Sequence, residues 1–215
     1  MKVLVSGTSR GIGKAIAEKF LRNNHVVIGM DILESSIKHP NYTHIQQDIR
    51  DENLPPLEDI EIIIANAGVF DEDDAISVNL EGTIHFVESY FLEENVKSIL
   101  FIASSSARNG AEFPRYSASK GGLLAYMKYL ANRVAPLGIV VNSLSPGGVM
   151  TASNDNIIKD KKKYEAVLNE TLTHKWAQAE EIAEWSYFLT VINKSVIGED
   201  ILIDNGEMLK SNFIW

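Results

Sequence analysis

The feature that most constrains this chain is the alternation of short apolar segments with longer segments of helical periodicity. Seven short segments predict β-strands, at 2–7, 25–30, 43–48, 61–68, 97–104, 138–148 and 199–206. After the first of them, Ile12, Ile16 and Phe20 recur at four-residue spacing, as they would on one face of a helix. Longer helices are expected at 77–95 and 114–135. This alternation is typical of a parallel sheet with helices on both faces.

We therefore predict one α/β domain over residues 1–215, built on a doubly wound, Rossmann-type parallel sheet of about seven strands. Ligands of such sheets bind beyond the carboxyl ends of the strands. Residues that carry chemistry are expected to gather at that edge, in the loops that follow each strand.

Composition narrows the range of functions. The 215 residues carry a formal net charge of −9, with no cysteine and five scattered histidines. An acidic chain is a poor partner for nucleic acid or an anionic membrane, because both select basic surfaces. A chain without cysteine has no disulfides or thiolate metal sites, so we expect a cytoplasmic location and no bound metal. The first apolar run is too short for a signal peptide, and no run approaches the roughly 20 apolar residues of a membrane span.

The segment SGTSRGIG at 6–13 joins the first predicted strand to the first helix. Its glycines permit a tight turn and a close approach of backbone to a diphosphate. The helix N-terminus then offers free N–H groups and a positive dipole end to that anion. Glycines at the first strand-to-helix turn favour a dinucleotide site over an ordinary turn. The expected cofactor contacts in this loop are Gly7, Ser9, Arg10, Gly11, Ile12 and Gly13.

Two other motifs compete for this loop, and both fail. A Walker A loop requires a glycine where Thr8 stands and a Mg²⁺-binding hydroxyl where Ala15 stands. The hydrolase pattern G-x-S-x-G does occur around Ser9. That fold takes part of its oxyanion hole from a loop after an earlier strand, however, whereas here a single predicted strand precedes the serine and leads directly into it.

Asp31 follows the second predicted strand, 18 residues after Gly13. An acid at this place in a dinucleotide fold hydrogen-bonds the 2′-hydroxyl of the adenosine ribose, and its charge repels the 2′-phosphate of NADP. Arg10 acts in the opposite sense, because a cation in the glycine loop attracts that phosphate. NAD is therefore the expected cofactor, and NADP is the less favoured alternative.

The segment RYSASKGG at 115–122 places Tyr116 four residues before Lys120, on the same face of a helix. A nearby positive charge lowers the pKa of a tyrosine, which is otherwise near 10, and so equips the phenol to move protons near neutral pH. The pair indicates acid–base chemistry on a hydroxyl or carbonyl group. A half-buried tyrosine beside a solvated lysine would have the same sequence.

Five separated motifs occur in order along the chain: SGTSRGIG, NAG at 66–68, VN at 78–79, YSASK at 116–120 and SPGGVMT at 145–151. With these motifs the chain resembles the short-chain dehydrogenase/reductase family over nearly its whole length. The resemblance implies an oxidoreductase that transfers a hydride between a nicotinamide cofactor and a small-molecule alcohol or carbonyl substrate.

The family pattern also implies roles for individual residues. Tyr116 resembles the catalytic acid/base, and Lys120 resembles the residue that lowers its pKa and binds the nicotinamide ribose. Ser104 resembles the serine that hydrogen-bonds the substrate oxygen, although Ser105 and Ser106 carry the same group beside it. In the reaction so implied, an alcohol loses its proton to Tyr116 as its hydride leaves for NAD⁺, and reduction is the reverse.

Further site residues are implied by the same resemblance. Asn79 resembles a helix asparagine whose backbone holds a water in a proton relay to the lysine. The remaining implied cofactor contacts are Asp48, Ile49, Asn66, Ala67, Gly68, Pro146, Gly147, Val149 and Thr151. Thr151 could equally be the N-cap of a helix.

The chain also departs from the family pattern. Little room remains for a helix between residues 48 and 61, where two consecutive prolines disfavour one, so we expect the sheet to be shortened around its fourth strand. The segment 69–78 is short as well. Residues 150–176 stand where the family has a substrate lid, and four lysines at 159–163 could meet an acidic substrate or simply form a solvated helix face.

Three functional hypotheses follow. The first is an NAD(H)-dependent alcohol dehydrogenase or carbonyl reductase. The second is an NADPH enzyme similar to 3-oxoacyl-carrier-protein reductases, against which Asp31 weighs. The third is a catalytically idle protein that senses nucleotides. A homo-oligomer, either dimer or tetramer, is expected from the resemblance, with Tyr126, Met127 and Leu130 as candidates for an apolar face.

Overall fold

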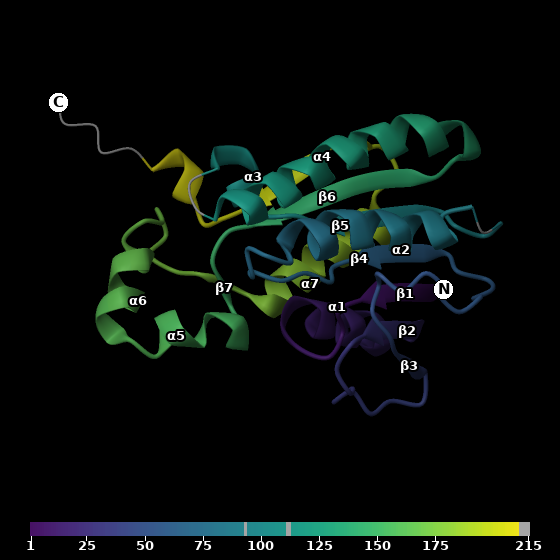
Figure 1. The fold of residues 1–215 in the computed structure, drawn as a ribbon, viewed down its shortest axis with the longest axis horizontal. Helices are drawn as coiled ribbons and strands as arrows, with labels where there is room; N and C mark the ends of the chain where they lie inside the picture. Colours follow the sequence, from purple (N-terminus) through teal and green to yellow (C-terminus); the bar gives the residue numbers. More distant parts are fainter. Residues whose placement is uncertain (93, 111–112, 211–215) are drawn as a thin grey trace.

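The computed structural model describes residues 1–92, 94–110 and 113–210. Its main feature is a seven-stranded sheet in the order β3-β2-β1-β4-β5-β6-β9, in which every neighbouring pair is parallel (Figure 1). Its strands are β1 (Lys2–Ser6), β2 (Val26–Asp31), β3 (Tyr42–Gln46), β4 (Ile62–Ala65), β5 (Ser98–Ile102), β6 (Val140–Pro146) and β9 (Asp200–Ile203). The seven predicted strands and the doubly wound fold class are therefore confirmed.

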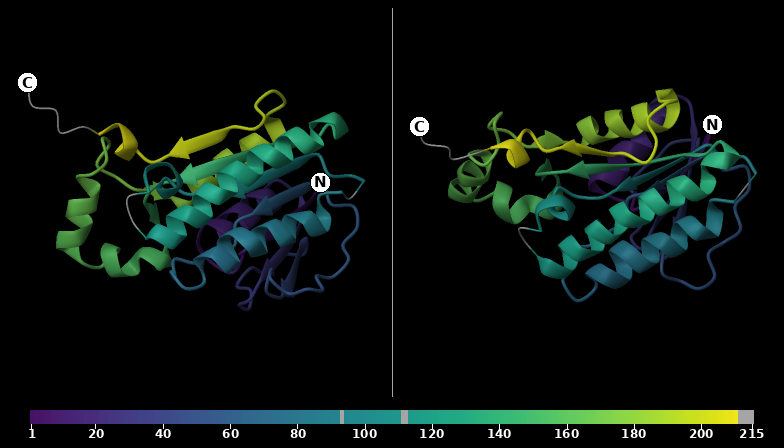
Figure 2. Two further views of the ribbon diagram at one scale, coloured as in Figure 1. Left: turned by 45° about the horizontal axis from the view of Figure 1, so that its top comes forward. Right: turned by 90° about the horizontal axis from the view of Figure 1, so that it is seen from above.

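Helices cover both faces of this sheet, with α1 and α7 on one face and α2 and α4 on the other (Figure 2). The helices and helical turns, in chain order, are α1 (Gly11–Arg22), η1 (Ile76–Gly82), α2 (Thr83–Tyr90), α3 (Ser106–Asn109), α4 (Pro114–Val134), η2 (Ala135–Leu137), η3 (Ala152–Asn154), α5 (Asp155–Ile158), α6 (Lys161–Leu168), α7 (Ala179–Tyr187), η4 (Phe188–Ile192) and η5 (Glu207–Leu209). Each face buries its own core, because successive strand residues point to opposite faces. Val3 and Ile62 pack under α1 and α7, whereas Leu4 and Ile63 pack under α2 and α4.

The flank between β3 and β4 carries no helix, as the prolines there predict. Residues 47–61 cross the sheet as an irregular segment, and Ile60 inserts into the core below α2 while Leu54 and Leu57 pack against its edge. The Tyr90 hydroxyl donates a hydrogen bond of 2.9 Å to the carbonyl of Pro55, which ties this crossing to the end of α2. The side chains of Leu54, Leu57 and Ile60 thus cover this flank of the sheet in place of a helix.

Several details differ from the sequence predictions. The helix expected at 77–95 is a π-helix, η1, followed by α2, and it ends at Tyr90 because the chain turns there toward β5; residue 93 lies outside the described part. Met127 and Leu130 are 0% exposed inside the chain, so they cannot form an interface with another subunit. The helix α7 and a second small sheet, β7 (Val149–Met150) with β8 (Ala177–Gln178), were not predicted.

The sheet order creates the crevice in which a ligand would bind. The chain runs outward from β1 through β2 to β3, and then returns to β4 and runs outward on the other side. The loops that leave β1 and β4 therefore separate at the centre of the sheet, at the edge where parallel strands end. In the described part of the chain, none of the helices is long and apolar enough to cross a membrane.

Candidate active site

The loop after β1 is packed so closely that side chains would not fit. Gly7 has a φ of +74°, and a Cβ there would lie 2.7 Å from the Asn66 amide nitrogen. A Cβ at Gly13 would overlap the carbonyl oxygen of Gly7. Asn66 braces the loop by donating to the carbonyls of Ser6 and Gly7 at 3.0 and 3.1 Å, while the Ser6 hydroxyl accepts the N–H groups of Asn66 and Ala67 at 3.0 Å each. The ends of β1 and β4 are thereby locked together.

The same loop presents the N-terminus of α1. Arg10 is the N-cap, no side chain caps it, and no acid lies in the first turn, so the N–H groups there are free to meet an anion. Thr151 lies beside this turn, with its methyl 3.6 Å from where a Cβ of Gly11 would stand. An open cleft of about 350 Å³ runs alongside and is lined by Gly11, Lys14, Ala15, Glu18, Met150, Thr151, Ala152, Ala179 and Glu180. A glycine cradle beside an uncapped helix end fits a diphosphate.

Asp31 ends β2 and faces the glycine loop. One carboxylate oxygen accepts the Ser9 N–H at 2.9 Å, and the other accepts the Leu33 N–H at 2.9 Å. The Ser9 hydroxyl donates to the Leu33 carbonyl at 3.0 Å. The carboxylate is therefore fixed in place, and each oxygen keeps a lone pair for a ligand hydroxyl. Arg10 is exposed in the same loop.

A second polar network, which the sequence did not indicate, supports this loop from β3. The Tyr42 hydroxyl lies 2.9 Å from the hydroxyl of Thr8 and 3.1 Å from Nδ1 of His44, and Nε2 of His44 lies 2.9 Å from the Leu33 carbonyl. Because a carbonyl can only accept, Nε2 carries the ring proton and Nδ1 accepts from Tyr42. The glycine loop and the segment after Asp31 are thus held by the same pair of β3 side chains.

Asp48 and Ile49 lie beyond the end of β3. The Arg50 guanidinium donates to both carboxylate oxygens of Asp48, with the shortest contact at 2.7 Å, and these bonds lower the pKa of that carboxyl. The side chain of Ile49 is 4% exposed and belongs to the core. The structure therefore commits both side chains to intramolecular contacts.

Ser104, Tyr116 and Lys120 converge beyond the end of β5, and all three are buried, at 7%, 7% and 4% exposure. Lys120 reaches across from α4 and donates to the Ile102 carbonyl at 2.9 Å. Its Nζ lies 5.9 Å from the centre of the Tyr116 ring. Tyr116 is hydrogen-bonded to Ser104, which selects Ser104 over its two neighbouring serines as the partner of the phenol.

Burial dominates the protonation of this cluster. It raises the pKa of the Tyr116 phenol, and the hydrogen bond with Ser104 offsets only part of that effect. Burial also lowers the pKa of Lys120 to about 8. The lowered tyrosine pKa expected from the Tyr–Lys spacing is therefore not what this arrangement has, because desolvation of the phenol is the largest influence on its pKa. Strongly shifted groups in a crevice are typical of catalytic sites.

Asn79 is fully buried in the π-helix η1, a type of irregularity that often marks functional sites. Its side chain accepts the Val69 N–H at 2.7 Å and donates to the Val69 carbonyl at 2.9 Å and to the Ser119 hydroxyl at 3.2 Å. A Cβ at Gly68 would lie 3.0 Å from the Asn79 amide oxygen and 3.4 Å from Nζ of Lys120. The segment after β4 is therefore held close against Lys120.

The loop after β6 completes the edge of the crevice. The Pro146 carbonyl accepts the Ser105 N–H at 2.9 Å, and the Gly147 N–H donates to the Ile203 carbonyl at 2.9 Å. Val149 is 4% exposed and begins the β7–β8 pair, and Met150 and Thr151 then line the cleft beside the glycine loop. The pair closes the base of the segment 151–176, whose helices α5 and α6 project from the body (Figure 1).

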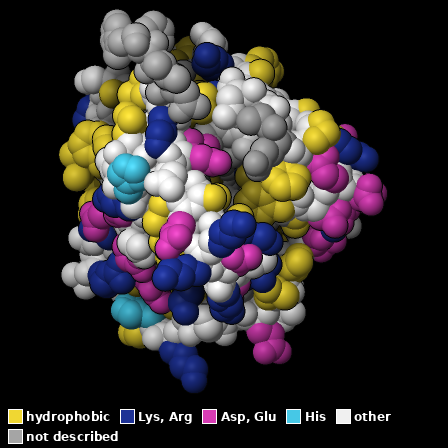
Figure 3. All heavy atoms as spheres, turned by 90° about the vertical axis from the view of Figure 1, so that its left-hand side faces the viewer, with side chains coloured by type: hydrophobic (Ala, Val, Ile, Leu, Met, Phe, Trp, Pro, Cys, Tyr) yellow, Lys and Arg dark blue, Asp and Glu magenta, His cyan; other side chains and the backbone are white. Residues whose placement is uncertain are grey.

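The lysines of that segment are mixed with acids. Lys159 pairs with Asp155 at 2.6 Å, and Lys163 lies 3.9 Å from Asp160. Figure 3 shows the face that carries this segment, on which positive and negative side chains are interspersed. Among the described residues, no group of three or more His, Asp or Glu side chains is arranged to hold a metal ion.

The predicted site residues thus form one continuous edge of the sheet, from Asp31 through the glycine loop to Ser104 and Lys120. Sequence analysis missed residues that contact this edge from elsewhere: Tyr42, His44, Arg50, Phe70 and Glu72. Arg50 contacts Asp48 two positions away, whereas Tyr42, His44, Phe70 and Glu72 each contact a residue distant in the sequence, which no local pattern indicates.

Comparison with known proteins agrees with this geometry. The family model described as enoyl-(acyl carrier protein) reductase matches residues 57–207. A 3-oxoacyl-[acyl-carrier-protein] reductase of Buchnera aphidicola is 30% identical over 95% of this chain and 95% of its own length. A glucose 1-dehydrogenase of Gluconobacter oxydans is 27% identical over 99% of this chain and 93% of its own.

Solved structures show the same fold. A short chain dehydrogenase family protein from Francisella tularensis superposes with a TM-score of 0.86 and 29% identity, covering 97% of this chain and 99% of the other. A structure from Agrobacterium tumefaciens with bound NADP superposes with a TM-score of 0.86 and 23% identity, covering 97% of this chain and 96% of the other.

Proposed function

Because the chain belongs to the short-chain dehydrogenase/reductase family and is an NAD(P)-dependent oxidoreductase, we propose that Tyr116 is its catalytic acid/base toward an alcohol or carbonyl substrate. The observation that carries this proposal is the buried convergence of Ser104, Tyr116 and Lys120 beside the glycine cradle. When bound, the nicotinamide cofactor supplies or accepts the hydride.

Ser104, Tyr116 and Lys120 would supply the other functions of the site. Ser104 hydrogen-bonds the substrate oxygen and fixes it next to the phenol, where charge develops during the reaction. Tyr116 moves the proton of that oxygen. Because burial raises the pKa of Tyr116, the phenol holds its proton at neutral pH, which suits the direction in which a carbonyl is reduced. Lys120 keeps its ammonium within the same buried space and would hold the nicotinamide ribose.

The cofactor would lie along the edge already described. The N-terminus of α1 and the glycine loop would hold the diphosphate, and Pro146, Gly147 and Thr151 would face the nicotinamide. The fixed carboxylate of Asp31 favours NAD, since it can accept from a ribose hydroxyl and repels a 2′-phosphate. The backbone of Ile49, rather than its buried side chain, would meet the adenine.

The substrate is proposed to carry an apolar group next to the reacting carbon. Phe70 and Phe113 are 50% and 48% exposed, and the ring centre of Phe70 lies 4.8 Å from that of Tyr116 and 6.5 Å from that of Phe113. Exposed aromatic rings beside a catalytic group offer an apolar wall to a ligand. The segment 150–176 would act as a lid over this wall.

A second candidate is 3-oxoacyl-carrier-protein reduction, which the name of the 30%-identical Buchnera relative favours. The lid does not present the uniformly basic surface that an acidic carrier protein would select, because Lys159, Lys161 and Lys163 each lie within 4.0 Å of an acid. A homo-oligomer and a cytoplasmic location remain predictions; on α4, Tyr129 is exposed and is the better interface candidate.

The deciding experiment measures NADH and NADPH turnover over secondary alcohols, ketones and hydroxyacyl thioesters, with Tyr116→Phe in parallel. We expect the variant to lose at least about 100-fold in kcat, the scale of general acid–base catalysis. Binding of NADH, followed by its fluorescence, should be kept. Undiminished turnover by Tyr116→Phe would contradict the catalytic role, and NADH binding without wild-type turnover would favour the idle, nucleotide-sensing protein.

A further inference from the structure

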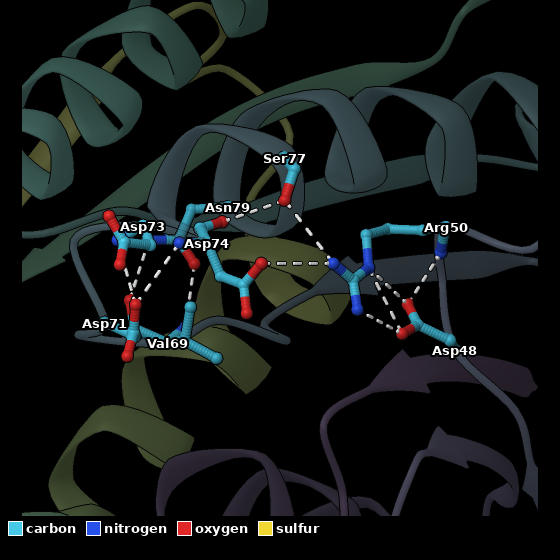
Figure 4. A network of polar contacts seen from close by, with 8 residues as sticks. All are labelled: Asp48, Arg50, Val69, Asp71, Asp73, Asp74, Ser77 and Asn79. Carbon is cyan, nitrogen blue, oxygen red and sulfur yellow. Dashed lines mark hydrogen bonds and ion pairs between the residues drawn. The ribbon is translucent and has the colours of Figure 1, made fainter.

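Residues 69–75, which lie between β4 and η1, contact the first turn of α4. We name this segment the strap. Its beginning is held by Asn79, which bonds both the N–H and the carbonyl of Val69 (Figure 4). Its end is held by Arg50, which lies 3.5 Å from Asp74. Within the strap, the Asp71 carboxylate accepts the N–H groups of Asp73 and Asp74 at 2.8 and 3.3 Å. The strap is therefore fixed at both ends and braced in the middle.

The middle of the strap caps α4. The carboxylate of Glu72 accepts the N–H of Arg115 at 2.9 Å and the N–H of Tyr116 at 3.3 Å. Pro114 has no N–H, and the Ser117 N–H donates to the Phe113 carbonyl at 2.8 Å. These contacts account for the first-turn donors of the helix, which normally depend on an N-cap side chain.

The N-cap residue of α4 cannot provide this cap with its own side chain. The N-cap position is Phe113, which has no acceptor in its side chain and adopts a φ of +47°. The acceptor comes instead from Glu72, 43 positions earlier in the chain than Arg115. A carboxylate at a helix N-terminus also interacts favourably with the helix dipole.

The strap touches the catalytic tyrosine a second time. The Phe70 ring lies against that of Tyr116, with centres 4.8 Å apart and planes inclined by 31°. Tyr116 is thus held at its backbone by Glu72 and at its ring by Phe70. A small displacement of a reacting group costs a large factor in rate, so contacts that fix the phenol have kinetic consequences.

We propose that Glu72 is a positioning residue for Tyr116: by capping α4 from the strap, it fixes the first turn of the helix that carries the phenol opposite Ser104. The proposal rests on the proposed function, since it assigns to Tyr116 the proton transfer described above. It concerns the position of the phenol and involves no contact of Glu72 with substrate or cofactor.

The test compares Glu72→Ala and Glu72→Gln with Asp73→Ala. Glutamine keeps the chain length and one acceptor oxygen, so it should restore part of the cap. Asp73→Ala is the control, because it also removes a strap carboxylate. The Asp73 side chain is fully exposed, and its contact with α4 is an ion pair of 3.9 Å with the Arg115 guanidinium, not a hydrogen bond to a backbone N–H. Hydrogen exchange of the amides at 115–116, read by mass spectrometry on peptides spanning them, reports the cap independently of turnover.

We expect Glu72→Ala to speed this exchange about tenfold, the effect of losing a helix cap, and to lower kcat about tenfold with the NADH dissociation constant changed less than twofold. Glu72→Gln should retain kcat within about threefold and Asp73→Ala within about twofold. Kinetics use the alcohol or ketone with the highest turnover in the panel.

Three results would overturn the proposal. Unchanged exchange in Glu72→Ala would show that the carboxylate does not cap the helix. Faster exchange with undiminished kcat would show that it only stabilises the helix end. An equal loss in Asp73→Ala would assign the effect to strap charge in general. A wild-type protein without turnover would instead remove the proposed function, while the exchange measurement would still judge the cap.

Discussion

Burial reverses the pKa shift of Tyr116 that its spacing from Lys120 predicts. The four-residue interval places both groups in one buried cluster, but burial acts on both at once: it raises the pKa of the phenol and lowers that of the ammonium. Desolvation is the largest influence on the pKa of each group, although the Lys120 ammonium lies 5.9 Å from the centre of the Tyr116 ring. Both shifts favour the uncharged form of the group, and holding an ammonium in such a dry site costs stability.

The first prediction concerns that cost. The pKa of Lys120 is lowered from 10.5 to about 8, so between these values the unfolded chain keeps a proton that the folded chain has lost. Stability should therefore rise with pH across this window, and below it the buried ammonium costs on the order of 3 kcal/mol. Urea unfolding of Lys120→Met and wild type should show the variant's relative stability falling by that amount from pH 7.5 to 10.5. Lys128→Met, on the exposed side of α4, is the control; a pH-independent difference for Lys120→Met would contradict the assignment.

The second prediction concerns Asp31. Asparagine keeps an acceptor for the Ser9 or Leu33 N–H but removes the charge that faces a 2′-phosphate. We expect Asp31→Asn to shift the ratio of kcat/KM for NADPH over NADH upward by about tenfold, or 1.4 kcal/mol. Glu34→Gln, an exposed acid in the same segment, should leave the ratio within about twofold. An unchanged ratio in Asp31→Asn would mean that Arg10, and not Asp31, sets cofactor choice.

At the scale of elements, the site depends on how closely its segments approach one another. The π-helix η1 packs against α4 near the consecutive glycines at 121 and 122. A Cβ at Gly122 would lie 2.9 Å from the side chain of Leu80, whereas a Cβ at Gly121 would meet its nearest neighbour, the Ala107 carbonyl oxygen, at 3.7 Å. Only one of the two positions needs the small residue.

The third prediction uses that pair. Gly121→Ala should stabilise the protein by about 0.5–1 kcal/mol, because alanine loses less conformational entropy in a helix interior. Gly122→Ala should gain nothing or lose about 1–3 kcal/mol, since Leu80 must shift to make room. Thermal and urea unfolding measure both. Equal effects of the two substitutions would show that η1 does not approach α4 as closely as described.

For the molecule as a whole, the irregular crossing at 47–61 replaces a helix without leaving the sheet uncovered. Ile60 is 0% exposed in the core shared by β4, β5, α2 and α4. The fourth prediction is that Ile60→Ala lowers the free energy of unfolding by about 2–4 kcal/mol, as in a regular core. Glu58→Ala, two positions earlier and exposed, should change it by less than about 0.5 kcal/mol. A small loss for Ile60→Ala in urea unfolding would show that the crossing is only loosely attached.

The sequence specified most of this architecture. Each of the seven main strands is an apolar run bounded by turn residues, and parallel strands buried on both faces require such runs, so local pattern and global fold agree. The glycine loop could also be predicted from the sequence, because close packing around Gly7 and Gly13 excludes any other residue type at these positions. Among the elements that were missed, β7 and β8 are two residues long each, and their pairing partners Val149 and Ala177 are far apart in the chain. Helix α7 begins with a capping box of Gln178 and Glu181, a boundary signal that was overlooked.

What the tertiary structure decided is the environment of Tyr116 and Lys120. The sequence placed Tyr116 one helical turn before Lys120, but their protonation follows from burial, which depends on every element packed around them. Likewise, Glu72 becomes the cap of α4 because the strap crosses in front of that helix, a contact between residues 43 positions apart. Local chemistry is encoded at each position along the chain, whereas desolvation and long-range hydrogen bonds exist only once distant segments have come together.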